Sequence, residues 1–493
     1  MSGTTKLGVA ALVVALGLGV LADALLRTPL FGLNGFFWIL CLLGGYWLLV
    51  RREAVGVSRE GWYLLAPALL AAIGFLWRDS PFLLMLDVAG LAIAFALMVG
   101  FGRTGGLGGA SVPEYIARGV SAVVLTLFGP FVLVLRDVRW SELPRDRRSV
   151  QMAAVGRGLL IALPLVVVFG ALFMAADAVF EHIITTAFGI DIGQAFSHVI
   201  FIGFWAWLAA GFFWAGLIQK WPEATAVPRA TGLSLGLTEM AIVLGLLNAL
   251  FLAFVVVQFR YFFGGAALVE ASTGLTFADY ARRGFFELAA VSALVLPVLL
   301  GSHFLLPRER PDQERLYRWL AGALVGQLFI IMASALKRMM LYERAFGLTE
   351  ARLYTTAFMV WLAVLFVWFG VTVLRGRWER FAAGVLISGY VALAALHLLN
   401  PDALIAGVNV QRLETGRRFD SHYLTTLSAD ATPVLLAALP KLEGEDRFTV
   451  ANGLLNRRES PIHRDWRSWN WGRSQEDAAL AANLDALKAM AGR

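Results

Sequence analysis

The chain has 493 residues, of which 59% are hydrophobic and 16% charged. A soluble domain is about half apolar and about a quarter charged, so this composition excludes a water-soluble fold. The formal net charge of +7 does not indicate nucleic-acid binding, because the arginines lie mainly in short segments between apolar runs, as membrane orientation requires. The sequence therefore predicts an all-α, polytopic protein of the cell membrane with the lipid bilayer as its surroundings.

Apolar runs of about twenty residues, each long enough for a helix to cross about 30 Å of hydrocarbon, recur from end to end. We predict about 11–12 spans, at 7–26, 31–50, 62–77, 82–101, 115–135, 159–180, 198–218, 236–257, 285–306, 317–336, 353–374 and 381–399. The first run is long and contains Asp23, so we interpret it as a retained span rather than a signal peptide. Cys41 lies inside a span and is expected to be a buried structural thiol.

The segment 115–135 is the weakest of these spans. Arg118 enters it, and Gly129-Pro130 interrupts it, because a proline inside a helix removes a backbone hydrogen bond. We expect this segment to be kinked, interfacial or re-entrant.

Lys and Arg in the short loops predict the orientation. Four alternate loops, at 136–158, 219–235, 307–318 and 375–380, carry fifteen of these residues, and the three between them, at 181–197, 259–283 and 337–352, carry seven. The first set is therefore placed in the cytoplasm and the C-terminal tail outside. The basic loop 51–61 should also be cytoplasmic, but this requires one membrane crossing fewer between it and residue 136. The conflict is resolved if 115–135 does not cross the membrane.

Composition divides the chain into N-terminal membrane helices (1–135), a membrane core (136–412) and a small helical extramembrane tail (413–493). In the tail, Thr432 before Pro433 predicts one helix start, and Ser474 with Asp477 three residues later resembles a capping box for another.

Polar residues concentrate between two apolar runs in the segment 258–287. Asp279, Arg283 and Glu287 follow at intervals of four, so they share one stripe of a helix. This stripe is either an ion ladder that matches charges at the membrane, or a site where Arg283 faces an anionic ligand or Glu287 carries a proton.

Two further polar groups follow. Ser334, Arg338 and Tyr342 step by four at the end of one span, and Asp402, Asn409 and Arg412 fall on one face of a helix after the last span. All three groups occupy the same side of the membrane, so we expect either one pocket for a small anion or a lipid headgroup, or a rim that contacts headgroups. The candidate ligand-binding residues are Arg260, Tyr261, Tyr280, Arg283, Glu287, Arg338, Tyr342, Arg352, Asp402, Asn409 and Arg412.

Several segments resemble a known bacterial membrane-protein family. They are ADAVF (176–180), FRYFFGG (259–265), ADYARRGFFEL (278–288), SALKRMMLYERAFGLTEARLY (334–354) and NPDALIAGVNVQR (400–412). They are similar to the family catalogued as domain of unknown function 4173, over most of residues 150–430. That family has no established activity, so the resemblance implies fold and location only.

Polar residues also lie within the spans, where they are costly and raise the hypothesis of a pathway or relay. They are Asp23, Asp87, Asp177, Glu239, Asn248, Gln327 and His397, of which Asp87 and Asn248 are the better interior candidates. No His or carboxylate cluster has metal-ligand spacing, so neither a metal nor a cofactor is predicted.

Three functions stay open. Transport of a small anion, ion or lipid fits the many spans and buried polar groups and is favoured. An enzyme acting on a phosphate-bearing lipid fits the arginine-rich face, because Arg suits bidentate phosphate contacts. A role as a sensor or assembly partner fits the external tail. The sequence does not predict which protein it would bind.

Overall fold

A computed structural model describes residues 2–28, 30–142, 169, 173, 177, 192–221, 236–273, 285–305, 311–414, 416–417, 419–459 and 465–492. These residues form helices and no strand, and eleven of the helices are long and apolar enough to cross a membrane. The expected all-α, polytopic fold is thus confirmed. Apart from three residues, the predicted span 159–180 lies outside the described part of the chain.

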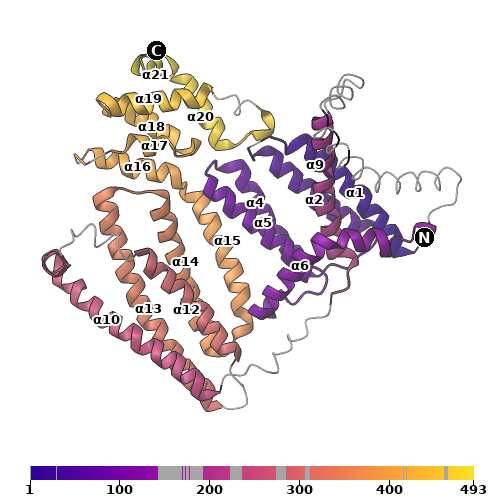
Figure 1. Ribbon diagram of the computed structural model, residues 1–493, viewed down its shortest axis with the longest axis horizontal. Helices are drawn as coiled ribbons and strands as arrows, with labels where there is room; N and C mark the ends of the chain where they lie inside the picture. Colours follow the sequence, from indigo (N-terminus) through magenta and orange to yellow (C-terminus); the bar gives the residue numbers. More distant parts are fainter. Residues whose placement is uncertain are drawn as a thin grey trace.

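The N-terminal helices and one later helix form the first bundle (Figure 1). Its members are α1 (Gly3–Leu25), α2 (Leu33–Arg52), α3 (Arg59–Tyr63), α4 (Leu65–Trp77), α5 (Pro81–Phe101), α6 (Val112–Val132) and α9 (Ile192–Phe213). The α1 face toward α9 carries small residues, with Ala11, Ala15 and Ala22 at most 1% exposed. Such a stripe lets two membrane helices approach closely, which accounts for the close packing of α9 on α1.

The second bundle contains α10 (Leu237–Thr273), α12 (Phe285–Leu305), α13 (Pro311–Phe346) and α14 (Glu350–Thr372). Between the two bundles lies α15 (Phe381–Leu399), as Figure 1 shows. Its first residue, Phe381, is buried in the core of the second bundle, whereas Leu393 is buried in the core of the first. Along its length, Leu386 and Tyr390 pack against the first core and Ser388 contacts Trp361 of α14, so this helix joins the two bundles.

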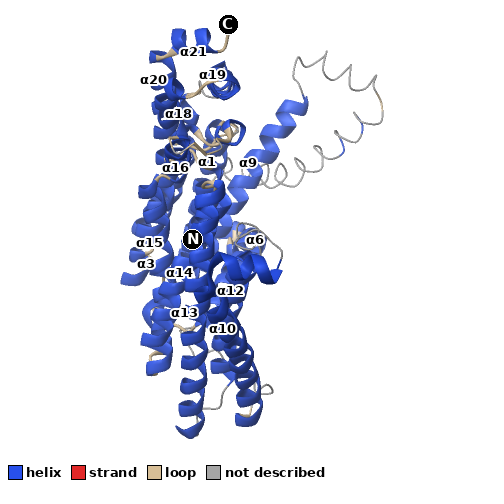
Figure 2. Ribbon diagram, turned by 90° about the vertical axis from the view of Figure 1, so that its left-hand side faces the viewer, coloured by secondary structure: helices blue, strands red, loops and turns tan. Residues whose placement is uncertain are grey.

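The C-terminal helices gather at one end of the molecule, which we name the tail end (Figure 2). They are α16 (Pro401–Leu413), α17 (Ser421–Leu424), α18 (Thr432–Ala438), α19 (Gly444–Glu459), α20 (Trp471–Ala482) and α21 (Leu484–Met490). They share a compact apolar core in which Leu435, Leu454 and Leu480 are fully buried. The Leu33 amide donates to the Trp469 carbonyl at 2.9 Å, so the α1–α2 connection lies at this end too.

Both ends of helix α6 lie at the end of the first bundle that is opposite the tail end. Near its start, the Tyr115 hydroxyl donates to the Leu107 carbonyl at 2.6 Å. Just after it, the Arg139 amide donates to Thr5 Oγ1, in the first turn of α1, at 3.3 Å. In Figure 1, α6 runs across its neighbours. Although its length and composition would allow a crossing, these contacts agree with the expectation that 115–135 is not an ordinary span.

Arg118 is accommodated in α6 by local partners. Its guanidinium lies 3.1 Å from Glu114 one turn earlier, and it also donates to the Gly100 carbonyl at 2.7 Å. Beyond Pro130 the helix changes to a π-helix, Leu133–Asp137. The charge is therefore matched within the helix, and the proline marks the change of helix type.

With α6 not crossing, the predicted sidedness is internally consistent. The Ser58 amide donates to the Gly102 carbonyl at 2.8 Å, and Arg103 donates to the Leu217 carbonyl at 2.9 Å. The basic connection after α2 therefore lies at the same end as the connections after α5 and α9. Which face of the membrane this end occupies stays a prediction.

Three local predictions were wrong. Helix α20 is capped by Asn470, whose side chain accepts from the Arg473 amide, and not by Ser474. Thr432 does not cap α18, because its hydroxyl donates to Glu476 at 2.6 Å instead. Cys41 is exposed on α2, since its side of that helix faces away from the bundle core. The three-part division at 135 and 412 stays a prediction.

Candidate functional site

A carboxylate and an imidazole meet inside the membrane helices. Asp87 of α5 lies 2.9 Å from Nε2 of His397 of α15, and the side chains are 1% and 2% exposed. The pair spans the contact between α15 and the first bundle. Because a lone carboxylate at membrane depth is costly, the histidine explains how α5 can carry one in an otherwise apolar sequence.

Helix α4 shapes the surroundings of this pair. Gly74 faces Asp87 so closely that a Cβ would collide with the carboxylate. Trp77, one turn later, stacks on the His397 ring with centroids 6.0 Å apart and planes 11° from parallel. His397 Nδ1 is buried and has no hydrogen-bond partner among the described residues. The pair is therefore tightly enclosed by α4.

Arg78 connects the Asp87–His397 pair to the tail. This residue ends α4, and its Nε donates to the backbone carbonyl of His397 at 2.9 Å. Its Nη1 lies 3.5 Å from Asp430 in the tail. One guanidinium thus contacts both α15, the last of the apolar membrane-length helices, and the C-terminal tail.

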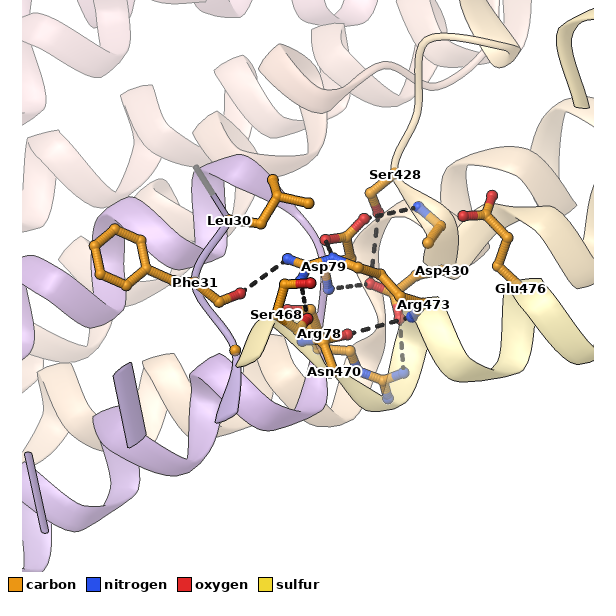
Figure 3. A network of polar contacts seen from close by, with 12 residues as sticks. Leu30, Phe31, Arg78, Asp79, Ser428, Asp430, Ser468, Asn470, Arg473 and Glu476 are labelled. Atoms are coloured by element: carbon orange, nitrogen blue, oxygen red, sulfur yellow. Dashed lines mark hydrogen bonds and ion pairs between the residues drawn. The ribbon is translucent and has the colours of Figure 1, made fainter. Parts of the chain in front are cut away.

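A second ion pair fixes the tail beside Arg78 (Figure 3). Arg473 of α20 lies 2.6 Å from Asp79, and it also donates to the carbonyls of Phe31, at 2.9 Å, and Ser468. Asn470 donates to the Phe75 carbonyl at 2.8 Å. Since these groups come from α4, the α1–α2 connection and the tail, they join three separate parts of the chain.

Three aspartates gather at this junction. The Asp79 amide donates to Asp430 at 2.7 Å, and Ser428 donates to Asp402 through its amide at 3.1 Å and to Asp430 through its hydroxyl at 3.4 Å. Burial raises the pKa of Asp430 to about 6, against the opposing effect of its hydrogen bond and Arg78. Burial also raises the pKa of Asp402.

Within the tail, Arg457 of α19 binds the loop before α18. It lies 3.2 Å from Glu476 and donates to the carbonyls of Thr425, at 2.6 Å, and Leu427. Because Glu476 also accepts from Thr432, the loop, α18, α19 and α20 are held as one unit.

The predicted ligand-binding residues fall into separate settings. At the end of α13, Arg352 donates to the Gly347 carbonyl and Arg412 to the Ala345 carbonyl at 2.8 Å. The Asn409 side chain binds both backbone groups of Leu348: it accepts from the amide at 3.3 Å and donates to the carbonyl at 2.8 Å. A cation is favoured at a helix C-terminus, so these contacts give the arginines a capping role.

The other predicted residues lie around this helix end, in the first turns of α12 and α16, or outside the described side chains. The Arg352 guanidinium lies 4.0 Å from the centroid of the Tyr342 ring, and Arg338 donates to Gln258 of α10 at 2.7 Å. Asp402 is fully buried, and Glu287 is exposed in the first turn of α12. The side chains of Arg260, Tyr261, Tyr280 and Arg283 lie outside what the structure describes.

The sequence did not point to the junction between α4 and the tail. Arg78, Asp79, Asp430 and Arg473 carry no periodic or spacing signal, and the pairs they form join residues hundreds of positions apart. Asp87 and His397 stood out individually as charged or polar groups in spans. Only the fold shows that they are partners.

The fold and these contacts define a multi-pass α-helical membrane protein with a docked helical tail. Residues 65–438 match the family described as "Domain of unknown function (DUF4153)", and the chain belongs to that family. The resemblance to family 4173 was therefore wrong, and the matched region begins in α4 rather than near residue 150. No curated protein and no solved structure matches the chain.

The family match includes both members of the Asp87–His397 pair as well as Asp79, Asp402 and Asp430. It ends with α18, so Arg473 and Glu476 lie beyond it. The intramembrane pair is thus part of the matched region, whereas the ion pair that fixes α20 has one partner inside that region and one outside.

Proposed function

We propose that this protein is a proton-coupled transporter of a small anion, ion or lipid, with Asp87 and His397 as its proton-exchange site. The observation that carries the proposal is this buried carboxylate–imidazole pair at 2.9 Å. Ionisable residues inside membrane segments mark proton relays in pumps and transporters, and imidazole is the side chain that changes charge near neutral pH.

The position of the pair supports coupling between a proton and a conformational change. Asp87 belongs to the first bundle, and His397 lies on α15, which also packs into the second bundle. When both groups are ionised, their attraction is strong because the surroundings are dry, and it weakens when the proton leaves the imidazole. The protonation state therefore changes how firmly α15 binds the first bundle.

The predicted ligand-binding residues remain part of this proposal. Arg338, Tyr342, Arg352 and Arg412 surround the end of α13 at the tail end. A negatively charged solute or headgroup that enters from the tail end would first meet the guanidinium groups of these three arginines. The capping hydrogen bonds of Arg352 and Arg412 and the bond from Arg338 to Gln258 would hold these groups in place before binding.

Charge displacement after a pH jump tests the proton site without knowledge of the substrate. Proteoliposomes of the full chain on a solid-supported membrane should give a transient current when the bath pH is lowered from 8 to about 6, spanning the usual His pKa. Asp87→Asn and His397→Gln should each lose most of that current.

The control is Asp23→Asn. Asp23 also faces a histidine, His198, at 2.6 Å, but His198 is about half exposed, whereas His397 is only 2% exposed. This variant should retain the current. Equal currents from the wild type and from a well-folded Asp87→Asn protein would refute the proposal.

A sensor is the second candidate, and the Arg78 contacts favour it. Arg78 contacts His397 and Asp430 together, so a change at the intramembrane pair could be passed to the tail. In that case Arg78→Gln should uncouple the tail from the pair, measured as faster hydrogen exchange in α18 and α20 with the pH-jump current unchanged.

A further inference from the structure

The turn between α15 and α16 contains two buried oxygen acceptors without donors. Asp402 is fully buried, and its Oδ2 accepts from the Ser428 amide at 3.1 Å, whereas its Oδ1 has no partner among the described residues. Two residues earlier, Asn400 Oδ1 is likewise buried without a partner. An acceptor left unsatisfied in a buried site costs free energy, so two of them so close in sequence need an explanation.

The charges around this turn leave Asp402 as the uncompensated member of the aspartate group. Asp79 is paired with Arg473 at 2.6 Å, and Asp430 lies 3.5 Å from Arg78. Arg457, whose charge also acts on Asp402, is within ion-pair distance of Glu476 instead. Among the described residues, none lies within 4.0 Å of Asp402 as an ion-pair partner.

The backbone at this turn favours a bound cation. Asn400 ends α15, where the negative end of the helix dipole attracts positive charge; Arg78 already donates to the His397 carbonyl in this last turn. Asp402 stands in the first turn of α16, where the positive end of that helix stabilises a carboxylate. Burial raises the pKa of Asp402 and so disfavours its ionised form, which a small cation at this turn would stabilise.

We propose that the α15–α16 turn binds a monovalent alkali cation such as Na⁺ through Asp402 Oδ1 and Asn400 Oδ1. Hard cations take oxygen ligands, and Ca²⁺ sites usually combine several carboxylates. Here one carboxylate oxygen and one amide oxygen are available, and no group of three His, Cys, Asp or Glu suited to a metal occurs in the described residues. Low ligand charge therefore favours a singly charged ion.

Thermal unfolding of the detergent-purified full chain tests this site. A ligand that binds only the folded state raises the midpoint with concentration. At constant ionic strength and pH 7.5, replacing choline chloride by NaCl should raise Tm by several degrees in the wild type. Asp402→Asn, which keeps the shape of the side chain, should lose that dependence.

Asn400→Gly provides a second variant that keeps the protein foldable. Asn400 has φ = +52°, a left-handed conformation that glycine adopts without strain, so the substitution removes the amide oxygen without disturbing the backbone. In this variant, the NaCl concentration that gives half of the full rise in Tm should be at least tenfold higher than in the wild type. Asp23→Asn, which changes a carboxylate far from this turn, should retain the full dependence.

Two results would overturn the proposal. One is a wild-type Tm that is equal in NaCl and choline chloride, because the turn then binds no Na⁺. The other is a well-folded Asp402→Asn protein that keeps the complete Na⁺ effect.

Discussion

Arg473 and Asp79 form an ion pair at 2.6 Å although 394 residues separate them in the sequence. The two side chains are only 8% and 16% exposed, and the arginine also donates to two backbone carbonyls. This pair joins the last part of the tail to the connection between α4 and α5. It therefore makes the tail part of the membrane domain's own structure.

Arg473→Ala should destabilise the protein strongly. It leaves the Asp79 carboxylate without its cation, and breaking a buried pair costs about 3–5 kcal/mol. We expect a lower midpoint of chemical unfolding, with trypsin cleaving the tail first. Adding Asp79→Asn should recover part of the loss. Lys441→Ala, which removes the exposed pair with Glu414, should change little. Equal stability of the Arg473→Ala and Lys441→Ala proteins would contradict this role.

Asp430 should make stability depend on pH. Its folded pKa is about 6 and its ordinary value is 3.8, so the folded state holds the proton more tightly. Its contribution is greatest below about pH 3.8 and decreases as the pH rises through about 6, because the buried carboxylate must then ionise. As the pH rises from 4 to about 6, the Tm of the wild type should therefore fall relative to the Tm of Asp430→Asn. A difference that stays constant over this range would show that Asp430 does not titrate there.

Gly74→Ala should disturb the Asp87–His397 pair. A Cβ at residue 74 would collide with the Asp87 carboxylate, and overpacking of this kind costs about 1–3 kcal/mol. Gly17→Ala is the matched control, because a Cβ at that position on α1 meets nothing within 4 Å. Unfolding midpoints of the two variants give the comparison. A loss of similar size in both would point to a general effect of alanine.

Both ends of α6 should be reached from the same side of the membrane. In a Cys41→Ser background, single cysteines at Gly109, before α6, and Ser141, after it, should react with an impermeant thiol reagent from one side. A cysteine at Glu445 in the tail should react from the other. Labelling of Gly109→Cys and Ser141→Cys from opposite sides would show that α6 crosses.

The sequence by itself determined the membrane character, the helical class and most of the spans. These features follow from local properties, since an apolar run long enough to cross the hydrocarbon forms a helix wherever it packs. Arg118 and Pro130 marked α6 as unusual for the same reason, because a charge and a missing backbone donor are local costs.

Only the tertiary structure decided which polar groups become partners. Asp87 and His397 are 310 residues apart, and nothing in their spacing says that α15 packs on α5. Arg352 and Arg412 have the residue types of an anion site, yet in the fold they donate to the Gly347 carbonyl, just after α13, and to the Ala345 carbonyl in its last turn. Charge and composition are properties of the chain, whereas the partner of each charge depends on helix packing across distant segments. That is why the intramembrane pair and the tail junction emerge only from the three-dimensional arrangement.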